Sequence, residues 1–249
     1  MYFNDIHIMY YVAIAIIGGI IGQFVDYCNR CFIKEQKIFS KESILKYKRI
    51  VLPNYWLILI TAIGYVCLLY KFGLNNTIGG NLNLIKYIIL LPMLECAFIV
   101  DLKEQIIPNR LNLLMFEIGL VTVFIHGFTN INIATNMLLG MFAGAGIFIL
   151  ITLIGGLIAG KEAMGMGDVK LMGALGLYFG LQSIVAISVL AFLIGAIGSI
   201  IYMVVKRKGA DNYIPFGPFI VISSLISIFV PFSLLFTILM KIFSLGLYN

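Results

Sequence analysis

The sequence predicts an all-α protein that crosses a membrane several times, and three observations predict it. Hydrophobic residues fill 61% of the 249 positions, whereas charged residues fill only 11%, less than half of the roughly 25% found in soluble domains. The mean hydropathy is +1.06. Apolar runs long enough to span a bilayer recur along the chain. Because lipid must surround most of this surface, we expect a polytopic membrane protein with about eight transmembrane helices.

The first four expected helices are separated by polar or glycine-containing connections. The segment 8–25 has no Lys or Arg before it and no small-residue cleavage site after it, so we expect a retained helix, not a signal peptide. A short basic loop, 26–54, leads to the second helix, 55–70. The third helix, 82–100, ends at Asp101. The fourth, 111–125, follows Pro108, which lacks an N–H and restricts the residue before it.

The last four expected helices contain many glycines and prolines. The fifth, 133–159, is long, and we expect its glycines at 140, 144 and 156 to be helix-packing contacts. The loop 160–167 precedes a short sixth segment, 168–179, and the seventh covers 183–205. The eighth, 213–243, contains three prolines. We expect all eight helices to form a single domain over residues 1–249.

The basic residues predict which side of the membrane each connection occupies. With eight spans and both termini outside, fourteen of the 17 Lys and Arg residues fall in inside loops. The inside residues are Arg30, Lys34, Lys37, Lys41, Lys46, Lys48, Arg49, Lys103, Arg110, Lys161, Lys170, Lys206, Arg207 and Lys208; Lys71, Lys86 and Lys241 are outside. Lys and Arg in short loops are retained in the cytoplasm, so Asp101 and Asp168 are both expected on the cytoplasmic side.

These two aspartates are the residues most suited to chemistry. A lone Asp at a helix end can simply be a solvated N-cap. However, Asp168 follows Gly165 and Gly167, which permit close approach, and Asp101 precedes the helix break at Pro108. Irregular backbone near membrane depth needs surrounding protein or a wet cavity. Two carboxylates sharing such a cavity can hold one proton between them and act on one water as general base and general acid.

No alternative catalytic set competes with the two aspartates. The two histidines, His7 and His126, are expected on the outer side, away from Gly165 and Gly167. The cysteines at 28, 31, 67 and 96 include two within apolar segments, which argues against a disulfide framework or a four-cysteine zinc site.

Three motifs in series resemble the bacterial type IV prepilin peptidases, which are GxGD-type intramembrane aspartic proteases. They are Asp101 followed by Ile107-Pro108-Asn109, then Gly165-Met166-Gly167-Asp168-Val169-Lys170, and finally Ile214-Pro215-Phe216-Gly217-Pro218-Phe219. Gly19-Ile20-Ile21-Gly22 is a weaker fourth match. The resemblance implies Asp101 and Asp168 as the catalytic pair, with Gly165, Gly167, Lys170, Pro108 and Asn109 shaping the active-site loop.

The resemblance also implies a substrate and a place. Members of this family remove a short basic leader from pilin-like precursors, just after a glycine, at the cytoplasmic membrane face. The expected location is therefore the bacterial cytoplasmic membrane, and the expected partners are prepilins or pilin-like precursors and the lipid bilayer, with no nucleic acid. A relative processing competence pseudopilins or archaellin-like precursors fits the same motifs.

The chain departs from the family in its first cytoplasmic loop. Larger members carry two Cys-x-x-Cys pairs there, whereas this chain has only Cys28-Asn29-Arg30-Cys31. Two thiolates do not complete a tetrahedral shell, so we expect no metal. Proteolysis by two aspartates requires no cofactor. Many members also methylate the new N-terminus with S-adenosylmethionine, a cofactor that applies here only where methylation is retained.

Two acids, Glu95 and Glu117, fall inside expected helices, where ionisable groups generally face the protein interior or a cavity. We assign Glu95 a structural or pocket role and group it with Pro215, Phe216, Gly217 and Pro218 as candidate substrate-binding residues. Intramembrane acids and broken helices also suit a proton- or cation-coupled transporter. Such a protein needs acids near the midplane and inverted repeats, whereas both aspartates are expected at cytoplasmic helix ends.

Overall fold

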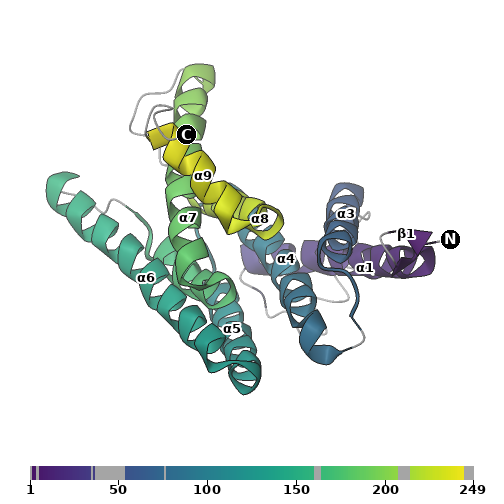
Figure 1. The fold of residues 1–249 in the computed structure, drawn as a ribbon. Coiled ribbons are helices and arrows are strands. Elements are labelled where there is room, and N and C mark those ends of the chain that lie inside the picture. Colours follow the sequence, from purple (N-terminus) through teal and green to yellow (C-terminus); the bar gives the residue numbers. More distant parts are fainter. Residues whose placement is uncertain are drawn as a thin grey trace. The chain divides into compact units, whose positions relative to one another are not determined.

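The computed structural model describes residues 2–3, 6–34, 36, 54–75, 77–159, 164–206 and 214–243, and almost all of them are helical (Figure 1). Within these ranges, six helices are long and apolar enough to cross a membrane, and two further apolar helices are shorter. The prediction of an all-α polytopic membrane protein is therefore confirmed. The chain divides into two compact units, Met1–Glu104 and Gln105–Asn249.

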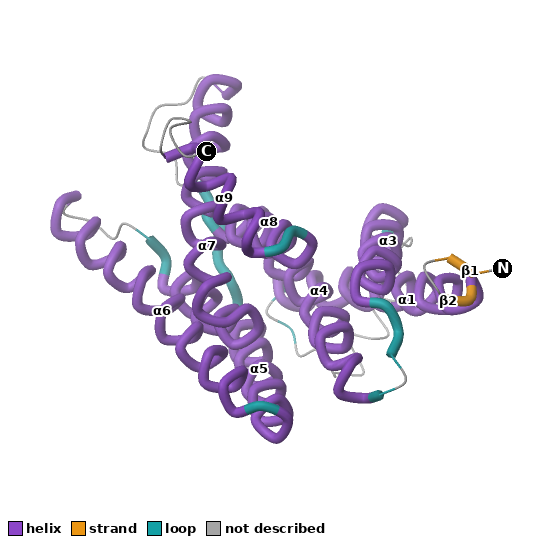
Figure 2. The backbone as a smooth tube through the Cα atoms, in the orientation of Figure 1, coloured by secondary structure: helices purple, strands orange, loops and turns teal. Residues whose placement is uncertain are grey.

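Unit 1 begins with a small hairpin that the sequence analysis did not anticipate. Strands β1 (Tyr2–Phe3) and β2 (Ile6–His7) pair in antiparallel fashion and are drawn in orange in Figure 2. Helix α1 (Ile8–Ile33) follows directly, and its first turn is capped by His7, whose Nδ1 accepts the N–H of Met9 at 3.3 Å. Helices α3 (Tyr55–Phe72) and α4 (Ile78–Glu104) complete the unit.

Helix α1 continues eight residues beyond its expected end at Val25, so the expected loop 26–54 begins too early. Asp26 is buried, but its carboxylate accepts bonds from Arg30 Nε at 2.9 Å and Asn54 Nδ2 at 3.3 Å. These partners offset the cost of removing the charge from water, and the helix therefore continues through this polar stretch. The basic residues of 37–53 lie outside the described residues.

The three helices of unit 1 pack through small residues and buried hydrogen bonds. A Cβ at Gly18 would lie 2.8 Å from the Cα of Ala62, so α1 and α3 approach backbone to backbone. Between α3 and α4, the hydroxyl of Thr61 donates to Glu95 Oε2 at 2.6 Å. Interhelical bonds of this kind supplement packing where lipid provides no hydrophobic driving force.

Unit 2 contains α5 (Asn109–Thr129), α6 (Ile131–Ala159), α7 (Met166–Lys206), α8 (Gly217–Phe229) and α9 (Phe232–Phe243). Asn130 alone connects α5 to α6, and Figure 2 shows this short link at the ends of the two helices. Because the connection is so short, α5 and α6 are antiparallel neighbours. Helix α7 packs against both of them.

The sixth and seventh expected segments form one helical run, α7, interrupted at Gly180. Gly180 has φ 74° and ψ 175°, a conformation that glycine adopts readily because it lacks a Cβ. The amide oxygen of Asn136 on α6 accepts the N–H of Leu181 at 3.3 Å and compensates for the interrupted helix pattern. The boundary expected at residues 180–182 is thus a kink within one element.

The eighth expected segment, 213–243, is two helices instead of one. Helix α8 ends at Phe229 and α9 begins at Phe232, with Pro231 between them. Proline has no N–H to continue the helical pattern and disfavours a helical predecessor. The two helices have 13 and 12 residues, about 20 Å each at 1.5 Å per residue, which is less than a bilayer core of about 30 Å.

Glycines bring α6 and α7 into direct backbone contact, as expected for Gly140 and Gly144. A Cβ at Gly140 would lie 2.5 Å from the carbonyl oxygen of Gly176, and one at Gly144 would lie 2.5 Å from the carbonyl oxygen of Met172. For Gly156, a packing role stays a prediction. The close approach fixes the first half of α7, which begins at the glycine motif, against α6.

Gly140→Ala should destabilise the protein because the added methyl group meets the Gly176 carbonyl. Overpacking of this kind costs about 1–3 kcal/mol. Gly146→Ala on the same helix is the matched control, since nothing lies within 4 Å of a Cβ there. Thermal unfolding in detergent measures both variants, and equal melting temperatures would contradict the proposed contact.

Candidate active site

Two motifs that are far apart in the sequence meet in unit 2. Asp168 is the third residue of α7, and its side chain is only 4% exposed. Its backbone N–H donates to the carbonyl oxygen of Gly165 at 3.1 Å, closing the first turn. A carboxylate in the first turn of a helix is stabilised by the helix dipole. The expectation that Asp168 begins a helix is confirmed.

The glycine motif owes its form to close contact and not to unusual torsions. In the described chain, positive φ at glycine occurs at Gly73 and Gly180 only. Gly167 instead lies inside the first turn of α7, where a Cβ would be 3.4 Å from the Cβ of Ile107. The expected tight turn at Gly167 is therefore a normal helical turn that lies directly against the Ile107-Pro108-Asn109 motif.

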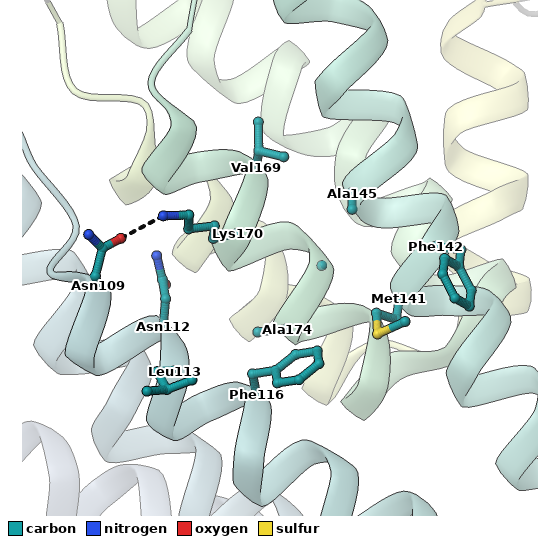
Figure 3. A pocket seen from close by; sticks show the side chains of 11 residues that line it. Asn109, Asn112, Leu113, Phe116, Met141, Phe142, Ala145, Val169, Lys170 and Ala174 are labelled. Atoms are coloured by element: carbon teal, nitrogen blue, oxygen red, sulfur yellow. Dashed lines mark hydrogen bonds between the residues drawn. The ribbon is translucent and has the colours of Figure 1, made fainter.

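Two side-chain hydrogen bonds join the motifs. Asn112 Nδ2 donates to the carbonyl oxygen of Gly167 at 3.1 Å, and Lys170 Nζ donates to Asn109 Oδ1 at 2.8 Å (Figure 3). Pro108 starts α5, and its carbonyl oxygen accepts the N–H groups of Leu111 and Asn112. The start of α5 and the start of α7 thus form one continuous polar junction.

Asn112 is a site residue that the sequence analysis missed. Its side chain is 3% exposed, and its Oδ1 has no hydrogen-bond partner within the part of the chain that is described. The sequence feature that could have identified it is the amide side chain of Asn112 itself, which lies four residues after Pro108 within the apolar run Leu111–Phe116. A buried amide in such a run requires partners, and the Gly167 carbonyl is one of them.

Asp101 lies in unit 1, three residues before the end of α4. Like Asp168, it is only 4% exposed. A buried carboxylate is costly unless it is hydrogen-bonded or protonated, and two such groups at helix ends are uncommon outside functional sites. The pairing of Asp101 with Asp168 stays a prediction.

The candidate substrate-binding residues occupy two different environments. Glu95 is enclosed in unit 1, where Thr61 donates to it. In unit 2, Gly217 and Pro218 are buried at the start of α8, next to Phe216. The ring of Phe216 lies within an aromatic cluster formed with Phe148, Phe192 and Phe219, with centroid separations of 5.1–6.0 Å. These contacts anchor α8, and substrate binding by the four residues 215–218 and by Glu95 stays a prediction.

We expected acids within the helices to face the protein interior or a cavity, and for Glu117 this expectation is wrong because its side chain is exposed. It lies on the exposed face of α5, because the buried face consists of Leu111, Asn112, Met115, Gly119, Val123 and His126 at helical spacing. His126 is buried near the other end of α5, where its Nδ1 lies 2.8 Å from the carbonyl oxygen of Thr122. His126 therefore lies about four helical turns along α5 from Asn112, the residue that contacts the glycine motif.

A cavity of about 550 Å³ opens beside the polar junction. It lies between α5, α6 and the first turns of α7, and its lining side chains are shown in Figure 3: Asn109, Asn112, Leu113, Phe116, Met141, Phe142, Ala145, Val169, Lys170, Gly173 and Ala174. The walls are apolar except at the end formed by Asn109, Asn112 and Lys170. This volume lies within the range of about 300–1,000 Å³ that is typical of ligand sites.

The described residues do not fit a zinc site. Cys28 and Cys31 are buried inside α1, and Cys96 is buried in α4. No group of three or more His, Cys, Asp or Glu side chains that could hold a metal occurs in the described ranges. Structural zinc sites need four ligands, which the described cysteines do not provide.

The helices of membrane-spanning length define a polytopic membrane protein. Its buried carboxyl groups lie at helix ends, and its glycine motif contacts a second motif, an arrangement that resembles an enzyme site. Residues 88–200 match the model of the Type IV leader peptidase family. The matched segment contains Asp101, Asp168 and both joined motifs. This segment is thus similar to the type IV leader peptidase family.

Curated relatives carry the name prepilin leader peptidase/N-methyltransferase. The protein of Legionella pneumophila is 31% identical over 151 residues, which cover 61% of this chain and 52% of that protein. The Aeromonas hydrophila protein is 30% identical over 52% of this chain and 43% of its own length, and the Xanthomonas campestris protein is 29% identical over 69% and 56%. The chain thus spans about half the length of these relatives. No solved structure matches it.

Asn112→Ala should loosen the first turn of α7, because the Gly167 carbonyl loses its side-chain donor. An unmade buried hydrogen bond costs about 1–3 kcal/mol, so amide hydrogen exchange of residues 164–169 should accelerate at least severalfold. Asn136→Ala removes a similar side-chain-to-backbone bond at the Gly180 kink and serves as the control. Exchange at 164–169 that is unchanged by Asn112→Ala would contradict the role assigned to Asn112.

Proposed function

We propose that this protein is a membrane aspartic endopeptidase that removes the leader from type IV prepilins or pilin-like precursors. Cleavage occurs after a glycine at the cytoplasmic face of the bacterial cytoplasmic membrane. The match of residues 88–200 to the model of the Type IV leader peptidase family supports this activity, as do relatives named prepilin leader peptidase/N-methyltransferase. The chain covers only about half the length of those relatives, so we propose the activity for this chain and do not infer it from the names of the relatives alone.

The observation that carries the proposal is the junction between the two motifs in unit 2. Asn112 holds the Gly167 carbonyl, Lys170 holds Asn109, and Asp168 is buried between these contacts in the first turn of α7. The two residues that follow Asp168, Val169 and Lys170, line a substrate-sized cavity, and a buried carboxyl group next to such residues suits general acid–base chemistry. The second carboxyl group is supplied by Asp101, which is also buried at a helix end.

The mechanism uses the two carboxyl groups on one water. In the reactive state, Asp101 and Asp168 share one proton, because two adjacent carboxylates do not both ionise. The ionised carboxylate takes a proton from water as the water oxygen bonds to the scissile carbonyl carbon. The protonated carboxyl group gives its proton to the carbonyl oxygen. When the tetrahedral intermediate collapses, the C–N bond breaks and the departing amine takes the proton that came from water. The remaining hydroxyl proton returns to the other carboxylate, so the pair is restored.

The positions of the acids favour hydrolysis over coupled transport. Asp101 lies in the last turn of α4, and Asp168 lies in the first turn of α7. Transporters use acids near the membrane midplane within discontinuous helices. Peptide hydrolysis instead needs access for water and for a polar leader, and the ends of helices supply both.

Asp168→Asn and Asp101→Asn should each abolish cleavage of a co-expressed pilin-like precursor, with a loss of at least about a hundredfold. An amide neither takes a proton from water nor provides one to the carbonyl oxygen. Glu104→Gln is the matched control, because Glu104 is an exposed acid three residues after Asp101. Intact mass of the product measures cleavage. Retained cleavage by either Asp variant would refute the aspartate mechanism.

The same mass measurement tests for methylation. S-adenosylmethionine is needed only if the new N-terminus is methylated, and proteolysis needs no cofactor. A product heavier than the cleaved chain by one methyl group, formed only when the wild-type protein is present, would show that the second activity is retained.

Gly167→Val should fold but lose most of the cleavage activity. The branched side chain would extend beyond the Cβ position, which already lies 3.4 Å from Ile107, and would push the two motifs apart. Wild-type turnover by a folded Gly167→Val protein would mean that this contact does not shape the site.

A further inference from the structure

We propose that a groove between α1 and α3 binds an acyl chain of an anionic phospholipid, and that Arg30 and Lys34 hold the phosphate of this lipid at one end of the groove. The inference concerns unit 1 and is independent of the proposed peptidase activity. It assigns a lipid site to a surface that the chemistry of Asp101 and Asp168 does not use.

The groove lies on the surface of unit 1, and its volume is about 730 Å³. Its lining is apolar except for the hydroxyl group of Tyr55 and the indole N–H of Trp56. Small residues create the space, because Ala15, Gly19 and Ala62 lie among larger side chains. The lining residues are Val12, Ala15, Ile16 and Gly19 of α1 and Tyr55, Trp56, Ile58, Leu59 and Ala62 of α3. A linear hydrocarbon chain is a ligand that such an apolar groove accommodates.

Two consecutive hydrogen bonds place Arg30 at the end of the groove that Tyr55 and Trp56 form. Asn54, the residue before Tyr55, donates through its Nδ2 to Asp26 Oδ1 at 3.3 Å. The other carboxylate oxygen, Asp26 Oδ2, accepts from Arg30 Nε at 2.9 Å. The Arg30 side chain is 47% exposed, so a ligand in the groove can reach its guanidinium group.

Arg30 and Lys34 together supply an excess of positive charge at this end. The bond from Arg30 to Asp26 uses one of the five N–H donors of a guanidinium group, and the fork of donors matches the oxygens of a phosphate. Lys34 is exposed one turn further along, where its backbone N–H donates to the Arg30 carbonyl oxygen at 3.2 Å. Because Asp26 balances only one of the two cations, a phosphate is the complementary group.

The groove and Arg30 lie on the same face of α1. Arg30 follows Gly19 by eleven residues, which is close to three full helical turns. From Arg30 to Ile16, which also lines the groove, the helix rises by about 21 Å. This rise is about half of the 40–45 Å thickness of a bilayer with its head groups. A lipid with its phosphate at Arg30 therefore has the end of its acyl chain near Ile16.

Tyr55 and Trp56 indicate the level of the lipid head groups. Their side chains are 70% and 76% exposed, although each has a large apolar ring. Tyrosine and tryptophan are enriched at the boundary between lipid and water, because the ring suits the lipid and the O–H or N–H suits the head groups. The apolar groove thus extends from this boundary into the membrane, and Arg30 lies at the boundary itself.

An anionic phospholipid fits these observations better than a helix of another protein does. Such a lipid carries an apolar chain and a negative phosphate in the order in which the groove presents apolar walls and then cations. A partner helix would fill the apolar walls but would gain nothing from Arg30 and Lys34 unless it also ended in an acid. Lipids that merely surround the protein would touch the groove without a preference for a head group, so this preference is the property to measure.

Trp56 reports on the occupant directly, because it lines the groove and is the only tryptophan in the chain. The full-length protein is reconstituted in phosphatidylcholine vesicles that contain a small fixed fraction of a lipid with brominated acyl chains, which quench tryptophan fluorescence on contact. This lipid is phosphatidylglycerol in one series and phosphatidylcholine in the other. We expect phosphatidylglycerol to quench at least about threefold more strongly. Equal quenching by the two lipids, or protection of Trp56 from both by a covering protein segment, would overturn the proposal.

Charge variants test the phosphate contact. Arg30→Gln and Lys34→Gln should each lower the preference for phosphatidylglycerol at least about twofold, because each removes a cation at the head-group level. Lys34→Gln leaves the pairing of Asp26 with Arg30 intact, so its result does not depend on that buried carboxylate. Lys103→Gln removes an exposed cation from the last turn of α4 and is the matched control. A loss as large with Lys103→Gln as with Lys34→Gln would mean that general positive charge, and not this site, attracts the lipid.

A groove-filling variant tests the position of the acyl chain. Ala15→Leu places a larger side chain in the groove and leaves both cations unchanged, so quenching by brominated phosphatidylglycerol should fall to the level of brominated phosphatidylcholine. Ala13→Leu makes the same change at an exposed position of α1 that does not line the groove, and it should keep the wild-type preference. If Ala15→Leu also keeps that preference, the acyl chain does not occupy the groove and the assignment is wrong.

Discussion

The hydrogen bond from Asn112 to the Gly167 carbonyl is the interaction on which the candidate site depends. It fastens the start of α5 to the start of α7, although the two residues are 55 positions apart. The contact of Gly167 with Ile107 and the bond from Lys170 to Asn109 reinforce the same junction. Without it, the first turn of α7, which carries Asp168, would be held less firmly against α5.

The packing of α6 against α7 supplies the rigidity behind this junction. Gly140 and Gly144 let α6 approach the carbonyl groups of α7 so closely that no side chain separates the backbones. In a membrane, helices gain little from excluding lipid, so close packing and interhelical hydrogen bonds must hold them. The glycines therefore act at a distance from the candidate site: they hold the first half of α7 in place, and the candidate site residues lie at its start.

Several polar side chains in this apolar chain form hydrogen bonds with partners on other turns or helices. Asp26 binds Arg30 and Asn54, Glu95 accepts from Thr61, and the Asn136 amide compensates for the kink at Gly180. Glu117 is different, because it lies on the exposed face of α5. Asp26 and Glu95 are buried beside a donor, whereas Glu117 follows the periodicity of its helix and is exposed.

Composition and periodicity were sufficient to determine the class of fold, because a chain with so few charged residues must be solvated by lipid and only helices or closed barrels then satisfy the backbone. The types and order of the motif residues were also sufficient to suggest the family whose model matches residues 88–200. These residues are Asp101, Pro108, Asn109 and Asp168. Element ends were less predictable. Helix α1 continues past Val25 because Asp26 finds partners from other residues, and Pro231 divides the last expected helix.

Only the tertiary structure decided which residues meet. The role of Asn112 depends on a carbonyl group 55 residues away, and no local pattern encodes that contact. The neighbour of Gly167 is likewise set by tertiary structure, since its backbone is helical and Ile107 lies beside it. The cavity with Lys170 at its polar end is formed by three helices together. The sequence by itself determined that lipid surrounds the chain, that the chain is helical, and which residues are candidates for catalysis, because these follow from side-chain chemistry and local backbone preference. The packing of α5, α6 and α7 decided the site, because contacts between distant segments depend on how whole helices fit.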